Sequence, residues 1–119
     1  MLRFLNAFFR RSREIEAELA PTEAAVGGKG EVELETWSDG AGSLEASVAY
    51  SALPNGSRVE VFCGEHQVAS LVVNGGFGKT FVDKPADGAG FDERLAVVGD
   101  TATFRVDGRT VYSGTFRRD

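Results

Sequence analysis

Cys63, Glu65 and His66 form the one cluster in the sequence that combines a thiol, a carboxylate and an imidazole. A structural zinc site needs four ligands, usually in paired Cys and His motifs, and the whole chain holds one Cys and one His. Catalysis by Cys63 would need His66 as its base, yet residues three apart on a strand point to opposite faces. We therefore predict no catalytic residue, no cofactor and no enzyme activity.

A second group of candidate ligands lies in the acidic segment 83–93, whose composition resembles that of a calcium loop. The segment does not fit the twelve-residue calcium-loop pattern, because Pro85 stands at its third position and Arg94 at its twelfth. We assign no metal site to it. Four residues remain as candidates for a non-standard site: Asp83, Asp87, Asp92 and Glu93.

These residues would be positioned by short strands and tight turns. Apolar and polar residues alternate with period two in segments 31–36, 44–50, 58–63 and 101–106. Asp107-Gly108 is typical of a two-residue hairpin turn. We predict a mainly β fold over residues 31–119, an antiparallel β-sandwich or small barrel of about eight strands.

The first twenty residues have a different pattern. Most of their apolar residues fall in one arc of a helical projection, and Pro21 then ends the helix. We predict one N-terminal amphipathic α-helix over residues 1–20, followed by a glycine-containing linker over residues 21–30. The apolar arc consists of Met1, Leu2, Phe4, Leu5, Phe8, Phe9, Ile15 and Leu19.

The charges of this predicted helix run from basic to acidic, which is the order that the helix dipole disfavours. Such a helix is marginal alone and should dock on another surface. The predicted docking residues are Phe4, Leu5, Phe8, Phe9 and Ile15. Three surfaces remain open: the protein's own β domain, a second copy or another protein, and a membrane surface. The mixed charges of the polar side make the membrane the least favoured of the three.

Composition limits the remaining choices. The net charge of −5 argues against nucleic acid as a partner, because phosphate binding needs a positive field. No apolar run is long enough to span a membrane, and arginines interrupt any secretory signal, so we expect a cytoplasmic protein or an assembled particle.

The leading hypothesis is a non-enzymatic structural or interaction module that docks through its N-terminal helix. It would belong to a homo-oligomer or a larger assembly, viral or shell-like for example. The alternative is a ligand-binding or divalent-cation-binding β module that uses the acidic Asp-Gly loops.

Overall fold

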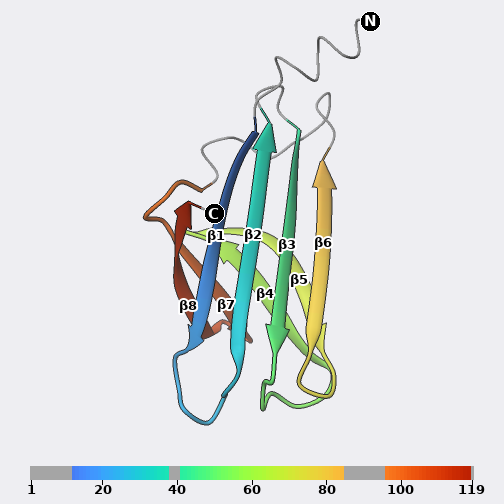
Figure 1. The fold of residues 1–119 in the computed structure, drawn as a ribbon. Coiled ribbons are helices and arrows are strands. Elements are labelled where there is room, and N and C mark those ends of the chain that lie inside the picture. The colour runs from blue at the N-terminus through green and yellow to red at the C-terminus, as the bar shows by residue number, and fades with distance from the viewer. Residues whose placement is uncertain (1–11, 38–40, 85–95, 119) are drawn as a thin grey trace, which may run out of the picture.

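The computed structural model describes residues 12–37, 41–84 and 96–118. The described residues form eight antiparallel strands in one sheet, with the order β5-β4-β7-β8-β1-β2-β3-β6. The sheet curls into a nearly closed barrel, in which β4, β5 and β7 cross behind β1, β2, β3 and β6 (Figure 1). The strands are β1 (Ser12–Pro21), β2 (Lys29–Trp37), β3 (Gly42–Ala49), β4 (Ser57–Cys63), β5 (His66–Val73), β6 (Gly78–Lys84), β7 (Thr101–Val106) and β8 (Arg109–Arg118).

The prediction of a mainly β protein is confirmed, but the predicted helix over residues 1–20 is wrong for the part that the structure describes. Ser12–Pro21 form β1, which pairs with β2 on one side and with β8 on the other. No helix occurs in the described ranges. Residues 1–11 lie outside them.

The physical reason is a period-two pattern inside the segment that we interpreted as helical. Ile15, Ala17 and Leu19 face the core, and the glutamates between them face outward. Ile15 and Leu19 also satisfy the four-residue spacing of a helix, so the apolar positions alone did not distinguish the two structures. Backbone pairing with β2 and β8 stabilises the strand conformation of this segment.

Residues of the predicted linker take part in the barrel as well. Pro21 belongs to β1, and Lys29 and Gly30 belong to β2. Between them Val26 is buried, and its carbonyl accepts a hydrogen bond from the Ala52 amide. The β1–β2 connection is therefore a packed turn.

The hydrophobic core lies inside the barrel and consists mainly of every second residue along the strands. Its largest members include Tyr112 and Phe104, whose rings meet edge to face with centroids 6.1 Å apart. The Tyr112 hydroxyl donates a hydrogen bond to the Gly27 carbonyl at 2.7 Å and shares another with the Ser51 hydroxyl at 2.8 Å. These bonds attach the β1–β2 and β3–β4 connections to β8.

The sheet has two edge strands, β5 and β6. Among the described strands β5 pairs along its length only with β4, and β6 only with β3. A single bridge between Asn74 and Phe77 joins the two edges at their connecting turn. β5 and β6 are therefore bridged only at this turn, and they do not pair along the rest of their length.

Candidate interaction surface

The outward face of β1, β2 and β3 carries a dense array of glutamates, which we call the acidic face. Because side chains alternate along a strand, every second residue of each strand points to this surface. β1 contributes three glutamates, β2 three and β3 one. The seven are Glu14, Glu16, Glu18, Glu31, Glu33, Glu35 and Glu45.

Strand register places these glutamates directly opposite one another. On β1 and β2 the opposed pairs are Glu14 with Glu35, Glu16 with Glu33, and Glu18 with Glu31. Like charges at directly opposed positions destabilise a sheet. Three successive pairs of this kind make the face a candidate functional surface.

Within the described residues, Arg117 and Lys79 lie close to glutamates of this face and offset part of the repulsion. Arg117 of β8 lies 3.2 Å from a Glu16 carboxylate oxygen and 2.9 Å from one of Glu18. Lys79 of β6 lies 2.6 Å from Glu45, and this hydrogen bond raises the pKa of the Lys79 ammonium above its ordinary value. The Arg117–Glu18 and Lys79–Glu45 pairs are solvent-exposed, so their contribution to stability is small, whereas the Glu16 side chain is 18% exposed.

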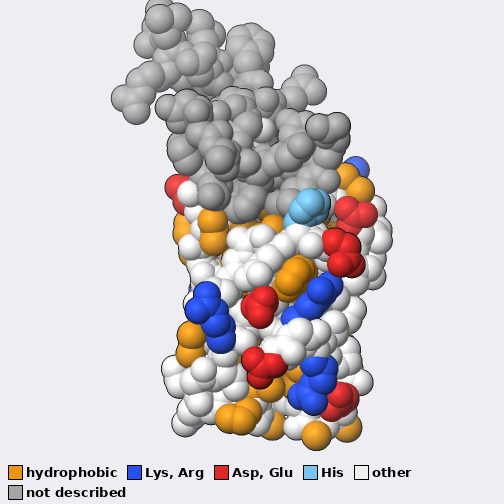
Figure 2. Space-filling view, turned by 180° about the vertical axis from the view of Figure 1, so that it is seen from behind, with side chains coloured by type: hydrophobic (Ala, Val, Ile, Leu, Met, Phe, Trp, Pro, Cys, Tyr) orange, Lys and Arg blue, Asp and Glu red, His pale blue; other side chains and the backbone are white. Residues whose placement is uncertain are grey.

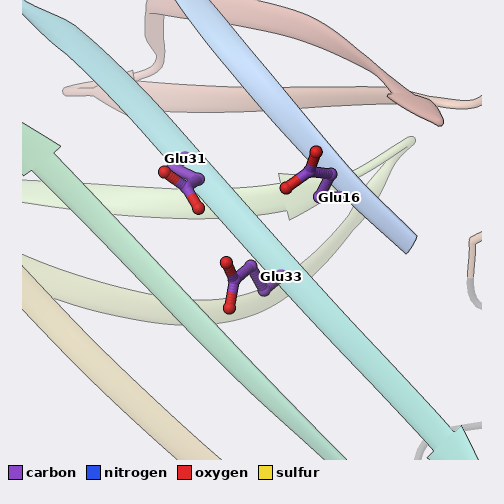
Figure 3. Close-up of side chains that lie close together, drawn as sticks. All are labelled: Glu16, Glu31 and Glu33. Atoms are coloured by element: carbon purple, nitrogen blue, oxygen red, sulfur yellow. The ribbon is translucent and has the colours of Figure 1, made fainter. Parts of the chain in front are cut away.

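Glu16, Glu31 and Glu33 come closest together (Figure 3), with one carboxylate oxygen of each within 4.8 Å of the others. Carboxylate oxygens are the ligands that calcium prefers. Glu16 already accepts hydrogen bonds from Arg117, and the trio lies on the open surface of the sheet. We therefore interpret it as the densest part of the acidic face rather than as a metal centre.

Phe81 of β6 places an apolar side chain beside the acidic face. It is 63% exposed and stands opposite Glu45 in the register of β3 and β6. Glu33, Glu45 and Phe81 contribute to a shallow hollow of about 160 Å³ on this surface. The face thus offers many negative charges and one large apolar contact.

The opposite face of the barrel is different. Basic and acidic side chains are intermixed there (Figure 2). In that region the Arg105 guanidinium lies 3.9 Å from the centre of the Phe62 ring and 4.0 Å from a Glu65 carboxylate oxygen. Glu60 on β4 stands opposite Arg105 on β7, a pair of opposite charges. The concentration of negative charge therefore belongs to one face of the protein.

The predicted cluster of Cys63, Glu65 and His66 lies at the β4–β5 hairpin. Cys63 and His66 occupy opposed register positions, but Cys63 is 1% exposed whereas His66 is exposed. Burial, with a smaller contribution from the nearby Asp100 charge, raises the pKa of the Cys63 thiol to about 12. A thiol that stays protonated at neutral pH is a poor nucleophile and a poor metal ligand.

The predicted docking and metal residues fall only partly within the described ranges. Ile15 is 2% exposed and packs in the core, so it does not serve as a docking residue in this fold. Asp83 is exposed on β6. The remaining predicted residues lie outside the described ranges: Phe4, Leu5, Phe8, Phe9, Asp87, Asp92 and Glu93.

The acidic face was missed in the sequence, although a signal for it is present. Glutamates alternate at 14, 16 and 18 and again at 31, 33 and 35. Two such runs become one surface only when their segments pair as neighbouring strands. Since the first run was assigned to a helix, its charges were not placed opposite the second.

Comparison of the sequence with known protein families and with curated proteins finds no match. Within the described residues there is also no helix of the length and apolar character that a membrane span requires.

Proposed function

We propose that this chain is a non-enzymatic interaction module that assembles with further copies of itself or with a protein partner. The observation that carries the proposal is the acidic face, where three glutamate pairs stand directly opposed on β1 and β2. Their repulsion lowers the stability of the free protein. A basic segment that covers the face would relieve this repulsion, and complementary charge would also steer the encounter.

The chain itself contains a segment with the required chemistry. Residues 1–11 include Arg3, Arg10 and Arg11 and no acidic residue. They also include four of the residues predicted above to dock, Phe4, Leu5, Phe8 and Phe9, which suit an exposed aromatic contact such as Phe81. The segment directly precedes β1, whose outward glutamates belong to the acidic face. In this proposal the N-terminal segment of one copy docks on the acidic face of another.

The environment that suits this module is the cytoplasm or an assembled particle. Cys63 is a free, buried cysteine, and the chain has no second cysteine to form an intrachain disulfide. That usage fits a reducing compartment.

The test uses the full chain with the double substitution Phe8→Ala/Phe9→Ala. We expect a lower mass in sedimentation velocity than the wild-type protein shows, because the docking segment loses its two adjacent aromatic contacts. The matched control is Val97→Ala/Val98→Ala, which removes exposed apolar side chains elsewhere and should leave the mass unchanged. Equal masses for the wild type and the Phe8/Phe9 variant would contradict the proposal.

The alternative function, divalent-cation binding by the acidic loops, has Asp83 as its one candidate ligand within the described residues. A cation at a hundredfold excess over its dissociation constant stabilises a protein by about 2.7 kcal/mol. Thermal unfolding with calcium, against sodium chloride of equal ionic strength, separates the two functions. A rise specific to calcium would favour the alternative, and equal melting temperatures would exclude it.

A further inference from the structure

Among the described residues, the edge of β6 that faces away from β3 is the feature that the acidic face does not account for. β6 pairs with β3 on one side, and no described strand pairs along its other side. An edge strand presents a row of unpaired backbone donors and acceptors, and proteins often use charge to keep other strands away. The charges of β6 do not have this repulsive arrangement, because they are complementary to those of a second β6 strand that runs antiparallel to the first.

The run Lys79-Thr80-Phe81-Val82-Asp83 has opposite charges at equal distances from a central phenylalanine. When two copies of this run lie antiparallel about Phe81, Lys79 stands opposite the partner's Asp83, and Asp83 stands opposite the partner's Lys79. Phe81 then stands opposite the partner's Phe81. Cross-strand pairs of opposite charge and of aromatic rings are both stabilising.

The exposed side chains of β6 are available for this pairing. Phe81 is 63% exposed, and the Lys79 side chain is 67% exposed while it contacts Glu45. Asp83 is exposed and takes part in no ion pair within the described residues. On the inner side, Thr80 and Val82 are only partly buried, so an added strand would cover more of both.

The register of such a pair is specific. A shift by two residues in either direction removes both Lys–Asp pairs and places Phe81 opposite Lys79 or Asp83. A shift by one residue turns the side chains of one strand to the wrong face. Centring on Phe81 is therefore the arrangement in which charge and apolar character both match.

We propose that two copies of this chain join through their β6 strands, antiparallel and centred on Phe81, and so form a symmetric dimer with one continuous sheet. Such a contact is isologous, since the same surface of each copy contributes to it. The inference rests on the proposed function in taking a second copy as the partner, but it assigns a different surface. The dimer would also bring the two acidic faces into one sheet surface.

The test is sedimentation velocity on the full chain from about 1 µM to about 1 mM, the range in which small interfaces associate. We expect the wild type to move from monomer toward dimer. Lys79→Asp and Asp83→Lys should each weaken the dimer by about tenfold or more, because both attractive pairs become repulsive. The double variant Lys79→Asp/Asp83→Lys should recover it, because each pair is restored with its charges exchanged.

Mixing supplies the sharpest comparison. The two single variants, each expected to associate less than the wild type when alone, should form a mixed dimer, because one carries only acidic and the other only basic residues at the two positions. The matched control is Lys29→Asp, which makes the same charge change on the same outward face but on β2, away from the edge. We expect this control to dimerise like the wild type. Circular dichroism of each variant checks that the fold is retained.

Each remaining outcome overturns the proposal. A wild type that stays monomeric throughout, single variants with wild-type mass, or two single variants whose mixture has no higher mass than either alone would each show that this pairing does not form. The proposed function is judged separately by the Phe8/Phe9 variant. If that variant loses mass while the β6 variants do not, the proposed function stands and the β6 dimer is wrong. The converse result leaves the β6 dimer and removes docking by the N-terminal segment.

Discussion

Neutralising one glutamate of the acidic face should stabilise the protein, and Glu31→Gln is the most informative change. A Glu31 carboxylate oxygen lies within 4.8 Å of one in Glu16 and one in Glu33, and Glu31 stands opposite Glu18. Two unit charges at this separation repel by slightly under ~1 kcal/mol in water. Arg117 and dissolved salt reduce that value. We expect a net gain of about 0.5–1 kcal/mol in the free energy of unfolding, or about 2–5 °C in melting temperature.

The assay is urea unfolding at low salt and again at 1 M salt, where the Debye length falls to about 3 Å. The gain of Glu31→Gln should shrink by more than half at high salt, because repulsion between the carboxylates is then screened. Glu60→Gln is the control, since Glu60 stands opposite Arg105 and should give no gain. A Glu31→Gln protein no more stable than the wild type at low salt, or a gain that is insensitive to salt, would refute the reasoning.

Three further predictions concern the support beneath the face. Tyr112→Phe should lower the free energy of unfolding by about 1–2 kcal/mol in urea titrations, because the Gly27 carbonyl loses its donor; an unchanged midpoint would contradict this. Cys63 has a pKa of about 12 when folded against 9.0 as its ordinary value. The contribution of Cys63 to the free energy of unfolding should therefore be constant below pH 9 and be lost as pH rises from 9 to about 12. Alkylation of the native thiol should stay slow, and rapid alkylation at pH 8 without denaturant would be inconsistent with burial. Gly114→Ala should cost about 3 kcal/mol or more, since a β-carbon there meets the Glu18 carbonyl of β1. Near-wild-type stability in thermal unfolding would show that β1 and β8 adjust freely.

The β part of the fold could be predicted from the sequence because its signals are local. Alternation in segments such as 31–36 and the Asp107-Gly108 turn identify strands and a hairpin without knowledge of their neighbours. β7 and β8 are joined at this turn, where Asp107 and Gly108 both have positive φ, 50° and 80°.

Residues 12–21 show where local signals fail. Ile15 and Leu19 fit one face of a helix and one face of a strand, and Ala17 is small enough to be read either way. The strand is selected by pairing with β2 and β8 on its two sides, and β8 lies almost a hundred residues away in the sequence, at Arg109–Arg118.

The candidate surface could not be predicted for the same reason. The acidic face exists only through the register of β1 with β2. A helix predicted in place of β1 therefore hides a surface that both strands form together. The self-complementary run on β6, by contrast, is readable in five consecutive residues. Its meaning depends on β6 being an edge strand, which the order of the sheet supplies.

The most direct measurement of the account is an amide chemical-shift titration of the full-length protein with a synthetic peptide of residues 1–11. We expect shifts concentrated on the outward residues of β1 and β2, and we expect both high salt and Glu31→Gln to reduce them. Shifts absent at millimolar peptide, or confined to the β4 and β7 face, would contradict the assignment of the acidic face as the docking surface.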